Sequence, residues 1–242
     1  MGRTLALPWF SCGSGCKIRF TPMSTARPKL PDAPARADIA IIGAGVMGAA
    51  TAYWLKRLAP QLSVMLIERD ERFSQASSSL SASSIRQQFT CPVNIALSQF
   101  GIEFLRQASQ YLSCEGEPID VGLTEPGYLY LASRAQAAGL REAWAIQTRH
   151  GAQVRLLTQA ELAQRFGWLN PDGIELASLG LSGEGWFDGP GLHQAFLKKA
   201  LALGAHRLQG QVVHLHSEGQ SPRRVSRAQL ADGRSLDFGA VV

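Results

Sequence analysis

Residues 38–58 have the sequence DIAIIGAGVMGAATAYWLKRL, which determines the first part of the fold. The short run at residues 39–42 is apolar and rich in isoleucine, which is typical of a buried parallel strand. Glycines then follow at positions 43, 45 and 48 in a G-x-G-x-x-G pattern, and the residues after them fit an apolar helix. The stretch therefore predicts a strand, a tight glycine turn and a helix, in that order.

Each glycine of this turn has its own role in a nucleotide-binding unit. Gly43 permits the tight turn, Gly45 lets the backbone approach a pyrophosphate, and Gly48 lets the helix pack closely on the sheet. The amides of the first helical turn and the positive end of the helix dipole then form an anion site without a cationic side chain. Taken alone, the pattern also fits a purely structural glycine turn.

The next apolar run supplies an acid where such a unit needs one. Residues 63–67 (SVMLI) predict a second strand, and Glu68 stands at its end. A carboxylate there can accept hydrogen bonds from both ribose hydroxyls of adenosine and would repel a 2′-phosphate, which argues against NADP. The alternative is that Glu68 is one charge in the solvated run 68–72. The pattern predicts that residues 38–68 bind the ADP half of FAD or NAD.

A serine-rich segment follows, and here the sequence resembles a known family. A flexible linker would explain serines at 77–79, 81, 83 and 84, but contact with a cofactor is the alternative. With the motifs SSIRQQF at 83–89, GYLYLAS at 127–133 and EGWFD at 184–188, the chain resembles the superfamily of D-amino-acid oxidase, sarcosine oxidase and dimethylglycine dehydrogenase. The resemblance spans nearly all residues after 37. It is strongest to a branch linked to assembly of mitochondrial respiratory complex I, together with bacterial relatives.

The resemblance implies that the cofactor is FAD, and it assigns roles to individual residues. Arg86 matches an arginine that holds the substrate carboxylate near the flavin, although a structural ion pair is an equally good interpretation. The implied cofactor-binding residues form the phosphate loop, the ribose-binding acid with its neighbour, the serine segment and one position near the adenine: Gly43, Gly45, Val46, Met47, Gly48, Glu68, Arg69, Ser79, Ser81, Ser83, Ser84 and Val212.

The expected fold class is α/β, a Rossmann-like FAD-binding domain of the GR2 type with an inserted α+β substrate domain. The expected FAD-binding domain covers residues 38–113 and 183–242, and the insertion covers 114–182. The patterns also predict helices at 135–150, 159–166 and 188–203, and strands at 154–158, 212–215, 227–230 and 238–242. In the family, further cofactor and substrate contacts follow such a last strand. We therefore expect a C-terminally truncated fragment that is inactive by itself.

Residues 1–37 are expected to lie outside the fold, as a disordered leader or as an over-extended start upstream of Met23. Five of the 24 Lys and Arg residues precede the first acid, Asp32, and the remaining 19 are balanced by 19 Asp and Glu. This neutral body argues against a nucleic-acid partner, and the apolar residues 5–10 are too short to span a membrane. The isolated histidines and the four scattered cysteines predict no metal site and no disulfide framework.

For the intact protein, the resemblance implies oxidation of the C–N bond of an amine or an N-substituted amino acid by hydride transfer to flavin. Oxygen, a carrier flavoprotein or a quinone would then accept the electrons. Two alternatives remain open: a non-catalytic, flavin-binding assembly factor associated with a respiratory complex, and an NAD-dependent dehydrogenase. The expected location is a bacterial cytoplasm, with the mitochondrial matrix as the alternative.

Overall fold

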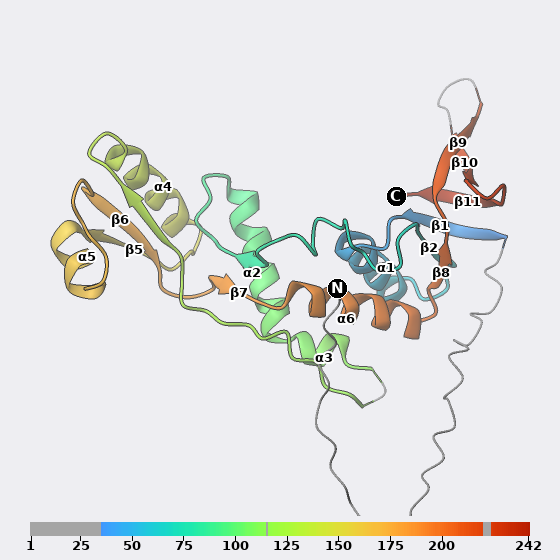
Figure 1. The fold of residues 1–242 in the computed structure, drawn as a ribbon, viewed down its shortest axis with the longest axis horizontal. Helices are drawn as coiled ribbons and strands as arrows, with labels where there is room; N and C mark the ends of the chain where they lie inside the picture. Colours follow the sequence, from blue (N-terminus) through green and yellow to red (C-terminus); the bar gives the residue numbers. More distant parts are fainter. Residues whose placement is uncertain (1–34, 115, 220–223) are drawn as a thin grey trace, which may run out of the picture. The chain divides into compact units, whose positions relative to one another are not determined.

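The strand, turn and helix expected from residues 38–58 are present in the computed structural model. β1 (Arg36–Ile42) leads through the glycine turn into α1 (Val46–Leu58), and β2 (Val64–Glu68) follows (Figure 1). β1 and β2 run parallel, with Ile42 opposite Ile67 in the register. The prediction of a βαβ-type start is confirmed, and the second strand includes Glu68 as its last residue.

The structure describes residues 35–114, 116–219 and 224–242. The interpretation of residues 1–37 as a leader lies, up to residue 34, outside the described residues, as do Cys12 and Cys16. Its end was placed too late, because Arg36 and Ala37 belong to β1 and Ala37 is buried in the core. The described residues belong to one compact unit.

The main sheet has six strands in the order β8-β2-β1-β11-β10-β9. The strands β8, β2, β1 and β11 run parallel to one another. β11 also forms an antiparallel meander with β10 and β9. The four strands from the C-terminal part of the chain are β8 (His206–Gln209), β9 (Val212–Glu218), β10 (Arg224–Leu230) and β11 (Ser235–Val241).

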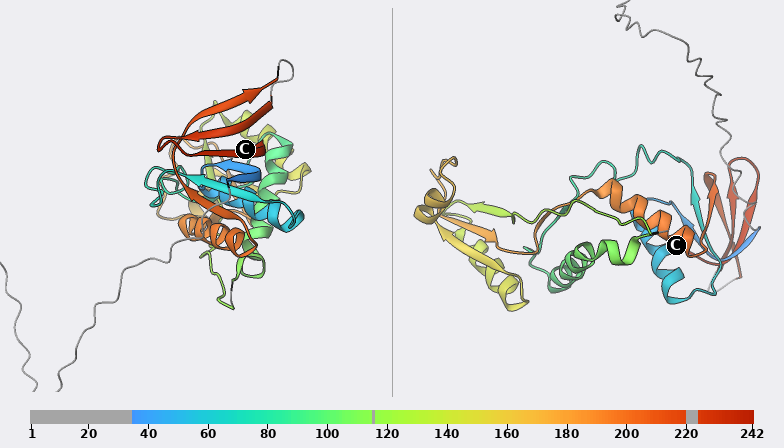
Figure 2. Two further views of the ribbon diagram at one scale, coloured as in Figure 1. Left: turned by 90° about the vertical axis from the view of Figure 1, so that its right-hand side faces the viewer. Right: turned by 90° about the horizontal axis from the view of Figure 1, so that it is seen from below.

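Both faces of β2 are covered, which explains why all five of its residues are buried. Val64 and Leu66 belong to a hydrophobic cluster with α1 and α6 (Gly189–Ala202), and Met65 and Ile67 pack against residues of β10 and β11. In Figure 2 the orange helix α6 lies on one side of the blue strands and the red meander lies on the other. The apolar run predicted as a buried strand is therefore the centre of two packed layers.

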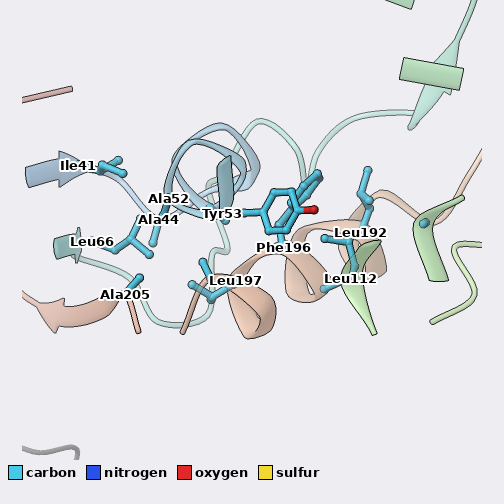
Figure 3. Packing of buried hydrophobic residues seen from close by; sticks show 14 of the residues in the cluster. Ile41, Ala44, Ala52, Tyr53, Leu66, Leu112, Leu192, Phe196, Leu197 and Ala205 are labelled. Carbon is cyan, nitrogen blue, oxygen red and sulfur yellow. The ribbon is translucent and has the colours of Figure 1, made fainter. Parts of the chain in front are cut away.

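The helices α1 and α6 pack against each other within this core. The rings of Tyr53 and Phe196 meet between the two helices with their centroids 5.4 Å apart (Figure 3). The helix expected over 188–203 is α6, and the Asp188 side chain caps it by accepting a hydrogen bond from the Gly191 amide at 2.9 Å. This packing holds α6 beside the glycine turn.

The residues expected to form the insertion contain a second, three-stranded antiparallel sheet in the order β4-β6-β5. Thr158 and Glu161 form a capping box at the start of α5, as the sequence pattern there favours. The helices α2 and α3 come before this sheet in the chain and were not predicted. The helices and strands between β2 and α6 are β3 (Ser84–Ile85), α2 (Pro92–Arg106), α3 (Ala108–Leu112), β4 (Leu129–Ala132), α4 (Ala137–Arg149), β5 (Val154–Thr158), α5 (Gln159–Arg165), β6 (Leu176–Gly180) and β7 (Gly185–Trp186).

Within the described part of the chain, no helix combines the length and the apolar character that crossing a membrane requires.

Gly48 is the glycine of the turn that the fold itself requires. A Cβ atom built on it would collide with the carbonyl oxygen of Gly43, a backbone atom that cannot move aside cheaply. We expect Gly48→Ala to lower the free energy of unfolding by about 3 kcal/mol, at the upper end of the usual cost of overpacking. Urea unfolding followed by circular dichroism measures this change.

The matched control is Gly139→Ala in α4, where a built Cβ meets no described atom within 4 Å. This substitution should raise the free energy of unfolding by about 0.5–1 kcal/mol, because alanine favours a helix interior over glycine. Equal effects of the two substitutions would show that close packing at Gly48 does not limit stability.

Candidate functional site

A cavity of about 650 Å³ lies at the carboxyl ends of β1 and β2. This is the place where open α/β sheets bind ligands. Its walls come from the glycine turn, the end of β2, the segment 69–78 and the chain leading into β9. Eight of the residues named from the sequence line it: Gly43, Gly45, Val46, Met47, Gly48, Glu68, Arg69 and Val212.

The glycine turn presents backbone amides to this cavity. Gly43 has a positive φ of 100°, and its own amide donates to the Ile67 carbonyl at 2.8 Å. The helical ladder of α1 starts with the bond from the Ala49 amide to the Gly45 carbonyl, so the amides of the preceding turn have no helical acceptor. Among the described residues no side chain caps α1, and its first turn carries no acid. The positive end of this helix is therefore available to an anion.

Gly45 leaves the space in front of this backbone open. A Cβ atom built on Gly45 meets no described atom within 4 Å, although the residue lines the cavity. A ligand can thus approach the backbone at Gly45 at a distance that any side chain would prevent. The turn fits a pyrophosphate group held by amides.

The carboxylate of Glu68 is fixed by the backbone on both of its oxygens. Oε2 accepts a hydrogen bond from the Ala44 amide and Oε1 accepts one from the Asp70 amide, each at 2.8 Å. Since each carboxylate oxygen can accept more than one bond, acceptor capacity remains for the hydroxyls of a ribose. Glu68 is only 9% exposed, so the interpretation of this residue as a solvated surface charge is wrong.

The segment after Glu68 forms the outer wall of the cavity. Hydrogen bonds from the Ser74 hydroxyl and from the Arg72 and Ser74 amides lower the pKa of the Asp70 carboxyl and tie this segment to itself. Phe73 adopts a left-handed backbone with φ of 53°. Phe73, Ser77 and Ser78 all line the cavity. Of the serine run, these first two members reach the cavity.

The structure places the other predicted serines away from this cavity. Neither Ser79 nor Ser81 lines it, and the Ser83 carbonyl accepts a hydrogen bond from the Phe187 amide at 3.0 Å. Ser84 lies in β3, opposite Trp186 of β7. Contact between these four serines and a cofactor stays a prediction, because the chain leaves the ADP side of the cavity after residue 78.

Arg86 also lies outside the cavity, next to β3. Its guanidinium stacks over the Phe89 ring at 4.9 Å, and its Nε atom is buried without a hydrogen-bond partner among the described residues. No described acid forms an ion pair with it. The structural ion pair considered for Arg86 therefore has no acceptor among the described residues.

Comparison with known proteins identifies the family of the chain. A family model described as FAD dependent oxidoreductase matches residues 38–242. The chain belongs to this FAD-dependent oxidoreductase family. Its fold is the mixed α/β fold of the family, and the cofactor of the family is FAD. The loop amides and Glu68 fit the diphosphate and the ribose of that cofactor in charge and in hydrogen-bonding capacity.

Curated relatives carry the name of an FAD-dependent oxidoreductase domain. FAD-dependent oxidoreductase domain-containing protein 1 of Xenopus laevis is 44% identical over 183 residues, which is 74% of this chain and 37% of that protein. The protein of the same name from Bos taurus is 40% identical over 201 residues, 81% of this chain and 41% of that protein. The chain thus spans about two fifths of the length of these curated relatives.

Solved structures share the fold at low identity. L-proline dehydrogenase from P. horikoshii superposes with a TM-score of 0.72 at 22% identity, over 86% of this chain and 52% of that one. Glycine oxidase from Geobacillus kaustophilus superposes with a TM-score of 0.69 at 24% identity, over 85% of this chain and 54% of that one. These two likenesses establish the fold.

Two buried polar residues near these sites were missed by the sequence analysis. His193 of α6 bonds the glycine turn, and Glu184 accepts hydrogen bonds from the Gln87 amide at 2.7 Å and from the Gln88 side chain at 2.9 Å. Glu184 is fully buried and so holds the loop that follows Arg86. Glu184 could have been found in the EGWFD motif, whereas nothing local marks His193. Among the described residues, no three His, Cys, Asp or Glu side chains are placed to hold a metal ion.

Loss of the Glu68 carboxylate should weaken the affinity for FAD. We expect Glu68→Ala to cost about 1–3 kcal/mol of binding free energy, because hydrogen bonds to a charged acceptor are lost and the Ala44 amide loses its partner. Titration of the flavin-free chain with FAD, followed by quenching of flavin fluorescence, gives the Kd. Glu142→Ala on the exposed side of α4 is the control. Equal Kd values for the two variants would contradict a role of Glu68 in the site.

Proposed function

We propose that this chain holds the ADP half of FAD in the cavity at the ends of β1 and β2, within a protein that oxidises the C–N bond of an amine or an N-substituted amino acid. The observation that carries the proposal is the pairing of open amides at Gly45 with the fixed carboxylate of Glu68 on one cavity. Membership of an FAD-dependent family supports it. The same membership favours FAD over the NAD alternative.

The residues of this chain would bind and orient rather than react. FAD, when bound, supplies a ring that accepts a hydride. The amides at the start of α1 would hold the diphosphate, and Glu68 would fix the ribose by accepting its hydroxyls. Because both groups are anchored to the backbone of the central strands, the cofactor would be held in one register relative to the sheet.

Arg86 supports a substrate that carries a carboxylate. Its guanidinium has no ion pair within the described residues, and a planar guanidinium binds a carboxylate through two parallel hydrogen bonds. Loss of a hydride from the carbon beside nitrogen, and of a proton from nitrogen, would give an imine that water hydrolyses. Two solved proteins of this fold are named for glycine and for L-proline.

The partners and the location belong to the same proposal. The small-molecule partner would be the amine, and the electrons would pass to oxygen, a carrier flavoprotein or a quinone. The family resemblance implies an association with a respiratory complex. The proposed location is a bacterial cytoplasm, with the mitochondrial matrix as the alternative.

Gly45→Val tests the cofactor site. The new side chain has open space, so the chain should fold as before, but the side chain would occupy the approach to the backbone that a diphosphate needs. We expect FAD to be lost from the purified variant, measured as the loss of the visible absorbance of the flavin. Gly167→Val is the control, since its Cβ also meets open space, away from the cavity. FAD retained by folded Gly45→Val would contradict the placement of the diphosphate.

Arg86→Gln tests the substrate class. In flavin-loaded protein that carries this chain, the variant should raise KM for N-methylated amino acids about tenfold or more, since a charged hydrogen-bonded pair is lost. KM for comparable amines without a carboxylate should not change. Arg165→Gln on α5 is the control, because this arginine lies on the surface of the insertion. Equal changes in KM for both kinds of amine would contradict carboxylate binding by Arg86.

The activity itself is tested by reduction of the bound flavin. Flavin-loaded protein is mixed without oxygen with a panel of amino acids, N-methyl amino acids and simple amines, and bleaching of the flavin band is followed. Bleaching by an amine, with release of the corresponding carbonyl product, supports the proposal. Flavin that no amine reduces, in a protein that co-purifies with respiratory subunits, would contradict it and favour the assembly-factor alternative.

A further inference from the structure

A buried histidine from the C-terminal part of the chain contacts the phosphate loop. His193 of α6 is 2% exposed, and its Nε2 atom lies 2.8 Å from the carbonyl oxygen of Ala44. A carbonyl oxygen can only accept a hydrogen bond, so Nε2 must carry the proton. The ring is held edge-to-face against Phe73, with the centroids 4.4 Å apart and the planes at 86°. The direction of this donor is therefore fixed by packing.

The bond from His193 is the second of two that fix Ala44. The amide of this residue donates to Glu68 Oε2, and its carbonyl accepts from His193. In a trans peptide the carbonyl and the following N–H point in opposite directions. Because the Ala44 carbonyl points toward His193 in the core, the amide of Gly45 points away from His193, and Gly45 lines the cavity.

We propose that His193 is a positioning residue that locks the Ala44–Gly45 peptide in the orientation that donates to an anion. This inference rests on the proposed function of the cavity as a diphosphate site. Without a donor at His193, rotation of the peptide could turn the Ala44 carbonyl dipole toward the diphosphate, where it would repel negative charge. The buried carbonyl would also lack a partner at its present position. His193 acts on the phosphates through the backbone and touches no reacting atom.

The proposal makes a prediction that a simple packing role does not make. A residue that only fills the core would, when replaced, weaken all ligands of the cavity together or unfold the chain. A residue that orients one peptide should weaken ligands with a diphosphate and spare those without one. ADP and adenosine differ in this group alone and are the two probes.

Two substitutions of similar size separate the hydrogen-bonding role of the His193 ring from its role in packing. In His193→Gln the amide nitrogen can reach the position of Nε2 and donate, whereas His193→Met offers a similar unbranched chain without a donor. Flavin-free wild type and both variants are titrated with ADP and with adenosine by calorimetry, and their thermal unfolding is measured alongside.

We expect His193→Met to raise the Kd for ADP about tenfold, which corresponds to about 1.4 kcal/mol, while the Kd for adenosine stays within about twofold. His193→Gln should restore most of the affinity for ADP. Equal losses for ADP and adenosine, unchanged ADP binding in His193→Met, or failure of His193→Gln to restore it would each overturn the inference. Absence of ADP binding in the wild type would instead overturn the proposed function of the cavity.

A measurement on the wild type keeps the inference testable if the methionine variant does not fold. Nitrogen-15 spectra of the His193 ring report which nitrogen carries the proton. We expect the proton on Nε2 in the free chain and in the ADP complex, together with a downfield shift of the Gly45 amide proton when ADP is added. A proton on Nδ1 alone in the ADP complex, or an unshifted Gly45 amide, would overturn the inference.

Discussion

The carboxylate of Glu68 joins the two halves of the nucleotide unit. One oxygen accepts the amide of Ala44 in the glycine turn, and the other accepts the amide of Asp70 at the start of the outer wall. The bond from the Ala44 amide is buried and the bond from the Asp70 amide is partly buried, and leaving a buried bond unmade would be costly. The acid that is expected to hold a ribose thus also ties the glycine turn to the start of the outer wall of the cavity.

The surrounding layers keep this bond in place. Both faces of β2 are packed, one against the helices α1 and α6 and the other against the meander of β9, β10 and β11. Gly48 lets α1 approach the turn closely, which brings the positive end of the helix to the cavity. The same helix α6 that covers the sheet also carries His193, so the packing of the core and the orientation of the anion site come from one element.

Local pattern was sufficient for β1, β2, β5, β9, β10 and β11, for α1 and for the position of Glu68, because glycine spacing and apolar runs are properties of neighbouring residues. It missed β6 and β8. Helices α2 and α3 were not predicted either, although Pro92 in the first turn of α2 is a common helix start signal. His193 meets Ala44 from 149 positions away, a contact that only the tertiary structure reveals. Val212 was assigned by family resemblance alone and does line the cavity, whereas Ser79 to Ser84 and Arg86 lie beyond it.

A crystal structure of the chain soaked with ADP tests whether this cavity is the nucleotide site. We predict that the diphosphate accepts hydrogen bonds from the amides that follow Gly45, that the ribose hydroxyls donate to the Glu68 carboxylate, and that the adenine lies near Val212. ADP bound elsewhere, or bound here with its diphosphate turned away from the start of α1, would contradict the account, because the open turn and the uncapped helix would then have no ligand to explain them.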